Sequence, residues 1–334
     1  MGKPVGIPAT KKLESMKKSI LNSLLCLGCA ASLFSCSKDD NASGIVSDPS
    51  TIRFESQVIS TKAGPVAGPT FTPGENVGIF ALQHATGTPA TWTTTPFMAN
   101  VVSTVGADGK SLTYSPLMNY PTVDEVDFYA YYPQSAAAVS DATGLSLPVT
   151  LASTAATQVD YMFATPVMNK VKPATATAIA FTFKHALAQV KFNVQKDNSV
   201  TDVINLTNLS VTANTTGTMN IADGVWSTVT TPADLEVYND AVGTGVAIAD
   251  VATGGTVVGA PLMIFPSLPT ALTFKVTIAG STYSFTPSIP AAGLEAGKIY
   301  TYTLKYNGSA IVFTTATVEP WVDAAALEPI NITN

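Results

Sequence analysis

The stretch from residue 178 to 194, AIAFTFKHALAQVKFNV, constrains the fold of this chain more than any other. Under a period of two, its apolar and aromatic side chains fall into two sets: Ile179, Phe181, Phe183, His185 and Leu187 on one face, then Val190, Phe192 and Val194 with the opposite parity. The central KHALAQV is compatible with a helix, but no helix start signal precedes it, and β-branched or aromatic residues flank it. The pattern therefore predicts two strand segments joined by a switch of face, so that one element serves two sheets.

The composition favours an all-β protein. The chain has 334 residues, of which 12% are charged, and it contains 23 glycines and 22 prolines. Abundant Thr, Ala, Val, Gly and Pro suit many short strands separated by frequent turns. The length leaves room for two domains with workable cores, and we expect them to meet near residue 178.

The first 36 residues have the pattern of an export leader. Met16 is followed by two lysines and by an apolar run over residues 20–34, which is too short to span a bilayer as a mature helix. We expect Met16 to be the true start and residues 1–35 to be the signal peptide. The LFSC string that ends at Cys36 resembles the bacterial lipobox, in which the cysteine thiol is acylated; an ordinary signal peptide with a chance cysteine is the alternative. Several acyl chains on Cys36 would anchor the protein stably, since each buried methylene contributes about 0.8 kcal/mol.

Charge and cysteine usage exclude several classes of function. After residue 35 the chain has 12 basic and 22 acidic residues, a net charge of −10, so nucleic acid is not expected as a partner. The three cysteines are Cys26, Cys29 and Cys36, which leaves no thiol for a disulfide, a metal site or a nucleophile in the folded part. Residues 36–50 are rich in Ser, Asp and Gly and read as a lipidated flexible linker.

The first expected strand spans residues 51–59. Ile52, Phe54 and Val58 alternate with polar residues and should face a core, whereas Arg53 lies on the opposite face. A loop with three prolines and three glycines follows over residues 60–74, and Lys62 stands near its start. Further strands are predicted at residues 77–82, 112–114, 126–132 and 161–164.

The EVDFYAYYP segment at residues 125–133 has two aromatic faces. Val126, Phe128, Ala130 and Tyr132 share one face, and Tyr129 and Tyr131 share the other. This second pair is a candidate for surface aromatics that stack on a glycan, with packing against a neighbouring layer as the alternative. The neighbouring carboxylates, Asp124, Glu125 and Asp127, lack the further ligands of a calcium loop or a catalytic pair, and a solvated acidic edge is expected.

The second half repeats the pattern of short alternating strands. They are expected at residues 204–211, 219–226, 257–265, 272–278, 283–285, 299–306 and 311–318, which is typical of a sandwich. Trp321 follows Pro320 and closes the last of them. The remaining tail, residues 324–334, has Leu327, Ile330 and Ile332 as its large apolar side chains.

Nothing in the sequence recommends an enzyme. The secreted part has two histidines, His84 and His185, and no G-x-S-x-G, H-E-x-x-H or P-loop string. His185 lies in an otherwise apolar strand and is expected to be a hydrogen-bonded structural residue. We expect no cofactor and no catalytic residue.

Several of these motifs together resemble the fimbrillin family of Bacteroides-type bacteria. They are the FTFKHALAQVKF string at residues 181–192, the lipoprotein signal, the AGKIYTYTL segment at residues 296–304, and Pro320-Trp321. The resemblance spans the secreted part and implies two transthyretin-like antiparallel β-sandwich domains in tandem, here residues 51–178 and 179–334. It also implies a surface-anchored pilus subunit or related adhesin, and the SKDD string after Cys36 resembles the surface-export signal of Bacteroides lipoproteins.

The resemblance implies an assembly mechanism as well. In that family a trypsin-like protease cuts after a basic residue just beyond the first strand, which corresponds here to Lys62, with Arg53 as the alternative. The other interpretation is that Lys62 is an ordinary surface lysine. The cut would release the strand that carries Ile52, Phe54 and Val58. The tail with Leu327, Ile330 and Ile332 would then act as donor strand for a neighbouring subunit, although it is short for that role; a tail packed on its own domain is the alternative.

These features define the expected partners and location. The partners are other fimbrial subunits, the outer membrane through the lipid on Cys36, the processing protease, and host proteins or glycans. The protein is expected at the outer membrane, exposed on the cell surface, and in a fimbria after processing. The alternative is a non-polymerising lipid-anchored adhesin, such as an anchor or tip subunit or a glycan-binding lipoprotein.

Overall fold

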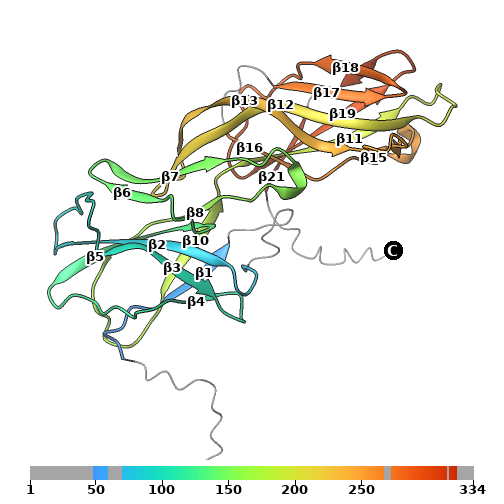
Figure 1. Ribbon diagram of the computed structural model, residues 1–334. Helices are drawn as coiled ribbons and strands as arrows, with labels where there is room; N and C mark the ends of the chain where they lie inside the picture. The colour runs from blue at the N-terminus through green and yellow to red at the C-terminus, as the bar shows by residue number, and fades with distance from the viewer. Residues whose placement is uncertain (1–47, 59–69, 267–271, 314–315, 322–334) are drawn as a thin grey trace, which may run out of the picture. The chain divides into compact units, whose positions relative to one another are not determined.

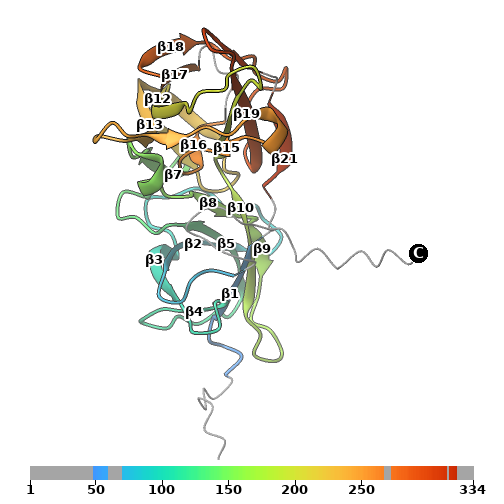
Figure 2. The same cartoon turned by 90° about the vertical axis from the view of Figure 1, so that its right-hand side faces the viewer.

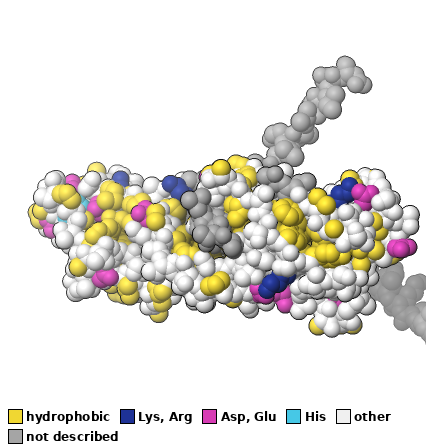
Figure 3. Space-filling model, turned by 90° about the horizontal axis from the view of Figure 1, so that it is seen from above, with side chains coloured by type: hydrophobic (Ala, Val, Ile, Leu, Met, Phe, Trp, Pro, Cys, Tyr) yellow, Lys and Arg dark blue, Asp and Glu magenta, His cyan; other side chains and the backbone are white. Residues whose placement is uncertain are grey.

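The computed structural model describes residues 48–58, 70–266, 272–313 and 316–321, and they form an all-β structure (Figure 1). The helical elements among these residues are two single turns of 3₁₀ helix, η1 (Ala155–Thr157) and η2 (Val251–Thr253). Charged side chains are sparse on the face shown in Figure 3, as expected for a chain with 12% charged residues. The all-β prediction is confirmed.

The first sheet closes on itself. Its strand order is β2-β3-β4-β1-β10-β8-β5-β9. Strand β2 also pairs with β5 along eight residues, which closes the strands from β2 to β5 into a ring and leaves β9 paired beside β5. The strands are β1 (Phe54–Val58), β2 (Asn76–Ala85), β3 (Met98–Val105), β4 (Ser111–Thr113), β5 (Asp124–Tyr132), β8 (Met162–Ala164), β9 (Val167–Lys170) and β10 (Ile179–His185). A first hydrophobic core fills the ring.

Two further sheets enclose a second core. The six-stranded sheet contains β11 (Ala188–Lys196), β15 (Thr256–Val257), β16 (Leu262–Ile264), β19 (Lys298–Tyr306), β20 (Ile311–Phe313) and β21 (Thr317–Pro320). The seven-stranded sheet contains β6 (Val139–Asp141), β7 (Gly144–Thr150), β12 (Asn205–Asn220), β13 (Trp226–Asn239), β14 (Val246–Ala247), β17 (Thr273–Ile278) and β18 (Ser281–Phe285). Because β6 and β7 precede residue 178 but pair in the sheet of β12, one sheet joins the two halves of the sequence; the division into domains at residue 178 stays a prediction.

The switch of face at residues 178–194 is confirmed. β10 belongs to the first sheet and buries Ile179, Phe181, Phe183 and His185, whereas β11 belongs to the six-stranded sheet and buries Val190, Phe192 and Val194. Leu187 lies between the two strands and joins a third hydrophobic cluster instead of the face of β10. The connection is fixed by hydrogen bonds from the Ala186 amide to the Tyr161 carbonyl (2.8 Å) and from the Gly297 amide to the Leu187 carbonyl (2.9 Å).

Three stretches in the second half differ from their predictions. Residues 257–265 hold most of β15 and β16 as separate short strands, and residues 311–318 hold β20 and the start of β21. Residues 219–226 were expected to form one strand, but they comprise the end of β12, a turn and the first residue of β13. The turn is set by Gly224, whose φ of 73° favours glycine and whose amide donates to the Asn220 carbonyl (2.8 Å). The alternation in the sequence therefore spans a hairpin.

Candidate functional site

The first strand, β1, lies in the interior of its sheet (Figures 1 and 2). It pairs in parallel with β10, from Phe54 opposite Ile179 to Val58 opposite Phe183, and antiparallel with β4. The Ile179 amide donates to the Arg53 carbonyl (2.7 Å), and the Ser56 amide donates to the Lys110 carbonyl (2.8 Å). Removal of β1 would therefore leave two neighbouring strands with unpaired backbone groups.

The side chains of β1 alternate as the sequence indicates. Ile52, Phe54 and Val58 are buried in the first core, and Glu55 is exposed. Ser56 is also buried, and its hydroxyl donates to the Lys110 carbonyl (3.1 Å), so the inward row contains one hydrogen-bonded polar residue. Residues 52–58 thus occupy a site between β4 and β10, and we name this site the β1 seat.

Phe54 is the central contact of the β1 seat. It is 3% exposed, and its ring lies 5.4 Å from the ring of Tyr114 and 5.5 Å from those of Phe128 and Phe181, measured between centroids. The Tyr114 hydroxyl donates to the Ile52 carbonyl (2.9 Å), and burial raises the pKa of Tyr114, which keeps this donor protonated. Three aromatic rings from different parts of the chain thus hold one side chain of the first strand. Sequence reasoning missed these partners because they are 60 or more residues from Phe54.

The two candidate processing positions differ in their surroundings. Arg53 is half-buried, and its carbonyl accepts the Ile179 amide, so the bond after it lies inside the paired region. A protease must bind its substrate in extended form and cannot do so there while β1 is paired. Lys62, Cys36 and the tail residues Leu327, Ile330 and Ile332 lie outside the described residues.

The proposed surface aromatics are buried, which corrects that expectation. Tyr129 is 4% exposed and Tyr131 is 0% exposed, and both belong to the third cluster, which packs β2 and β5 against β7. Burial raises the pKa of each to about 12. The Tyr131 ring covers Gly78, where an added Cβ would lie 2.2 Å from the ring. Packing against a neighbouring layer, the alternative interpretation, is the correct one.

The acidic edge is only partly solvated. Asp127 is 1% exposed; its Oδ1 accepts the Asn169 amide (2.7 Å) and lies 3.2 Å from His84 Nε2. The expectation of a solvated edge is therefore wrong for Asp127, because β9 and His84 supply partners distant in sequence. Among the described residues no group of three His, Cys, Asp or Glu side chains is suited to hold a metal ion.

His185 has the structural role expected of it. Its Nδ1 lies 2.6 Å from Asp160 Oδ2, both side chains are buried, and its ring stacks on Trp321 at 4.0 Å with an interplanar angle of 2°. Burial raises the pKa of Asp160, while the hydrogen bond and charge of His185 oppose that shift.

No helix in the described ranges is long and apolar enough to cross a membrane.

Comparison with known proteins places this fold. A putative cell adhesion protein from Bacteroides uniformis has a TM-score of 0.58 at 20% identity, covering 81% of this chain and 98% of that one. A fimbrial protein from Bacteroides vulgatus has a TM-score of 0.59 at 16% identity, covering 80% and 99%. No protein with a curated description matches. The sequence profile of the fimbrillin-like family matches residues 61–321, most of the chain, and the protein therefore belongs to the fimbrillin-like family.

Proposed function

We propose that this protein is a structural subunit of a surface fimbria, in which the β1 seat of one subunit receives a strand from the next. The observation that carries the proposal is the position of β1: a short N-terminal strand fills the interior of a sheet through an apolar row. Family membership and the likeness to fimbrial and adhesion proteins support the fimbrial role. Two tandem transthyretin-like sandwiches, residues 51–178 and 179–334, are the architecture we propose for it.

The free energy available in the β1 seat is large enough to drive assembly. An incoming strand that buries three side chains like Ile52, Phe54 and Val58 gains roughly 5 to 9 kcal/mol before ordering costs, at about 1.5–3 kcal/mol each. Backbone pairing with β4 and β10 adds direction and register. While β1 remains attached it competes at an effective concentration on the order of millimolar, so the uncut protein stays a monomer.

Processing would convert the precursor into the assembling form. In this proposal the protein is exported as a lipoprotein acylated on Cys36 and is cut after Lys62 by a trypsin-like protease. The cut frees both β1 and the lipid anchor, because both precede it in the chain. The tail with Leu327, Ile330 and Ile332 then supplies the donor strand.

The second candidate is a lipid-anchored adhesin that keeps β1 and never polymerises, such as an anchor or tip subunit that binds host proteins or glycans. The observation that favours it is that β1 is held by many contacts: Phe54 packs against three rings, and the strand is paired on both sides.

Limited trypsin digestion of the protein lacking its leader separates the two candidates. The pilin proposal expects a new N-terminus at Ala63, dissociation of the β1 peptide, and a ladder of oligomers by mass measurement. The Lys62→Gln variant is the matched control and should keep β1 and remain a monomer, whatever cuts occur at the other exposed lysines. A protein that is cut after Lys62 but retains β1 and stays monomeric refutes strand replacement, and a start at Phe54 identifies Arg53 as the processed residue.

A further inference from the structure

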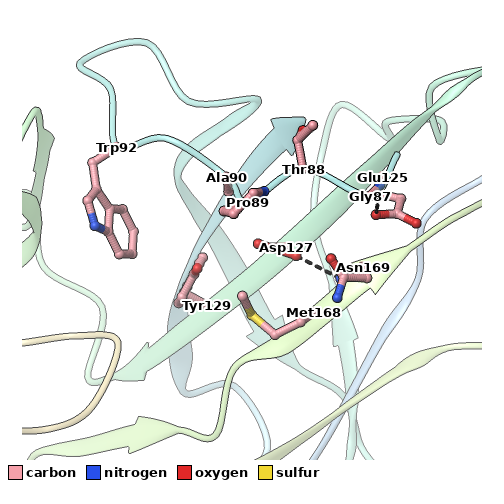
Figure 4. Close-up of a pocket in the computed structure, with 10 residues that line it drawn as sticks. All are labelled: Gly87, Thr88, Pro89, Ala90, Trp92, Glu125, Asp127, Tyr129, Met168 and Asn169. Carbon is pink, nitrogen blue, oxygen red and sulfur yellow. Dashed lines mark hydrogen bonds between the residues drawn. The ribbon is translucent and has the colours of Figure 1, made fainter. Parts of the chain in front are cut away.

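A cavity of about 630 Å³ opens beside β5, away from the β1 seat (Figure 4). The segment after β2 forms one wall with Trp92, β5 contributes Glu125, Asp127 and Tyr129, and β9 contributes Met168 and Asn169. This volume lies within the range of small-molecule sites, about 300–1,000 Å³. The cavity is thus large enough for a side chain or a small ligand.

The polar lining of the cavity includes two carboxylates, Glu125 and Asp127, beside the side chains of Thr88 and Asn169. Asp127 is almost fully buried, and its Oδ1 accepts both of its hydrogen bonds, from the Asn169 amide and His84; no described residue bonds its Oδ2. Glu125 accepts from the Gly87 amide with Oε2 (3.3 Å), and no described residue bonds its Oε1. No lysine or arginine of the described residues lines the cavity, and His84 can balance one of the two carboxylates at most. The site therefore presents negative charge and free acceptors to whatever enters.

The apolar lining includes two aromatic rings beside Pro89, Ala90 and Met168. The Trp92 and Tyr129 rings lie 5.3 Å apart, between centroids, at an interplanar angle of 50°. Figure 4 shows both rings on the left, whereas Gly87 and Glu125 lie on the right. Aromatic faces attract cations, and indole most strongly. Tyr129 keeps its proton because burial raises its pKa to about 12, so it adds no third charge.

From this lining we propose that the cavity binds a guanidinium group. A guanidinium has five donors and no acceptor, it pairs with two carboxylates at once, and its plane stacks on aromatic rings. A neutral sugar hydroxyl both donates and accepts, and would leave the carboxylate that His84 does not balance without a counter-charge. Two sources share this chemistry, an arginine side chain of a partner protein and a small free guanidinium compound.

Calorimetric titration tests the proposal on the protein without its leader. The probe is Nα-acetyl-arginine methylamide, and the matched ligand control is the citrulline analogue, which has the same shape without the charge. We expect measurable binding of the arginine probe and at least about tenfold weaker binding of the citrulline probe, since a charge-assisted pair is lost. Propylguanidinium and a Gly-Gly-Arg-Gly peptide distinguish the sources: tighter binding of the peptide identifies a partner protein, and equal or tighter binding of propylguanidinium identifies a small ligand.

Two protein variants localise the binding. Glu125→Gln should weaken the arginine probe about tenfold or more, whereas Asp124→Asn, the matched control, should change it less than twofold, because Asp124 bonds Gln83 and does not line the cavity. Trp92→Leu, a second test that leaves the carboxylates intact, should also weaken it. Absence of binding, equal binding of the citrulline probe, or equal affinities in Glu125→Gln and Asp124→Asn would overturn the proposal.

Discussion

Truncation of Phe54 to alanine tests whether β1 can leave its seat while the rest of the protein stays folded. Phe54 is 3% exposed and contacts three rings, so its removal should cost about 3–5 kcal/mol. If β1 opens as a local unit, this cost raises the population of the open state roughly 100- to 4,000-fold, at about 1.4 kcal/mol per factor of ten. The control is Glu55→Ala, which changes an exposed side chain of the same strand.

Amide hydrogen exchange measures this opening directly. The Ser56 and Ile179 amides report it, because they donate to Lys110 and Arg53 across the two edges of β1. The Val258 amide donates to the Phe192 carbonyl (3.0 Å) near the six-stranded sheet and serves as the reference. In Phe54→Ala we expect faster exchange at Ser56 and Ile179 with little change at Val258. Equal acceleration at all three amides would show that β1 leaves only on global unfolding and would refute the reasoning behind strand replacement.

Three further predictions concern packing and pH. Gly78→Ala places a Cβ 2.2 Å from the Tyr131 ring and should destabilise the protein by about 1–3 kcal/mol in urea unfolding; a neutral result would show that the ring moves freely. His185→Ala leaves the buried carboxyl of Asp160 without its partner and should cost about 3–5 kcal/mol in the same assay, whereas a loss below 1 kcal/mol would contradict a buried pair. His84 has a raised pKa because, although burial lowers it, the hydrogen bonds to the neighbouring carboxylate and carbonyl and the two nearby negative charges raise it more. Its contribution to stability is therefore present below pH 6.5 and is lost as the pH rises through the folded-state pKa, so the stability difference between the wild type and His84→Gln should shrink from pH 6 to 8; a constant difference would contradict the shift.

The local pattern of the first strand and of residues 178–194 could be predicted because alternation is a property of neighbouring residues. The switch between β10 and β11 is predicted by the apolar positions, which are odd-numbered up to Phe183 and even-numbered from Val190. The partners of β1 could not be predicted, because the backbone of β10 and the rings around Phe54 come from distant parts of the chain. Alternation also could not tell whether Tyr129 faces solvent or a third layer, since the layer that buries it includes β7.

Strand β13 could not be predicted from alternation either. Most of its residues are exposed, it contains Pro232, and it pairs along its length with β12, with one further bridge from Glu236 to Thr154. Only Leu235 and Val237 are buried, so most of the strand lacks a buried face that would produce alternation. Its pairing is decided by the long partner strand. The burial of Asp127 likewise depends on His84, which is 43 residues away in the sequence. The residues next to Asp127 do not predict that contact.

The parallel pairing of β1 with β10 also affects the order in which the chain folds. Gln57 and Thr182 are bonded across this pair although they are 125 residues apart. Contacts between such distant residues form slowly, since the chain between them must first be ordered. The first strand to be synthesised is thus expected to be among the last to dock, and an apolar strand that waits unpaired is prone to aggregate with other copies. Before β1 docks, a newly synthesised chain is therefore most prone to associate with other copies of itself.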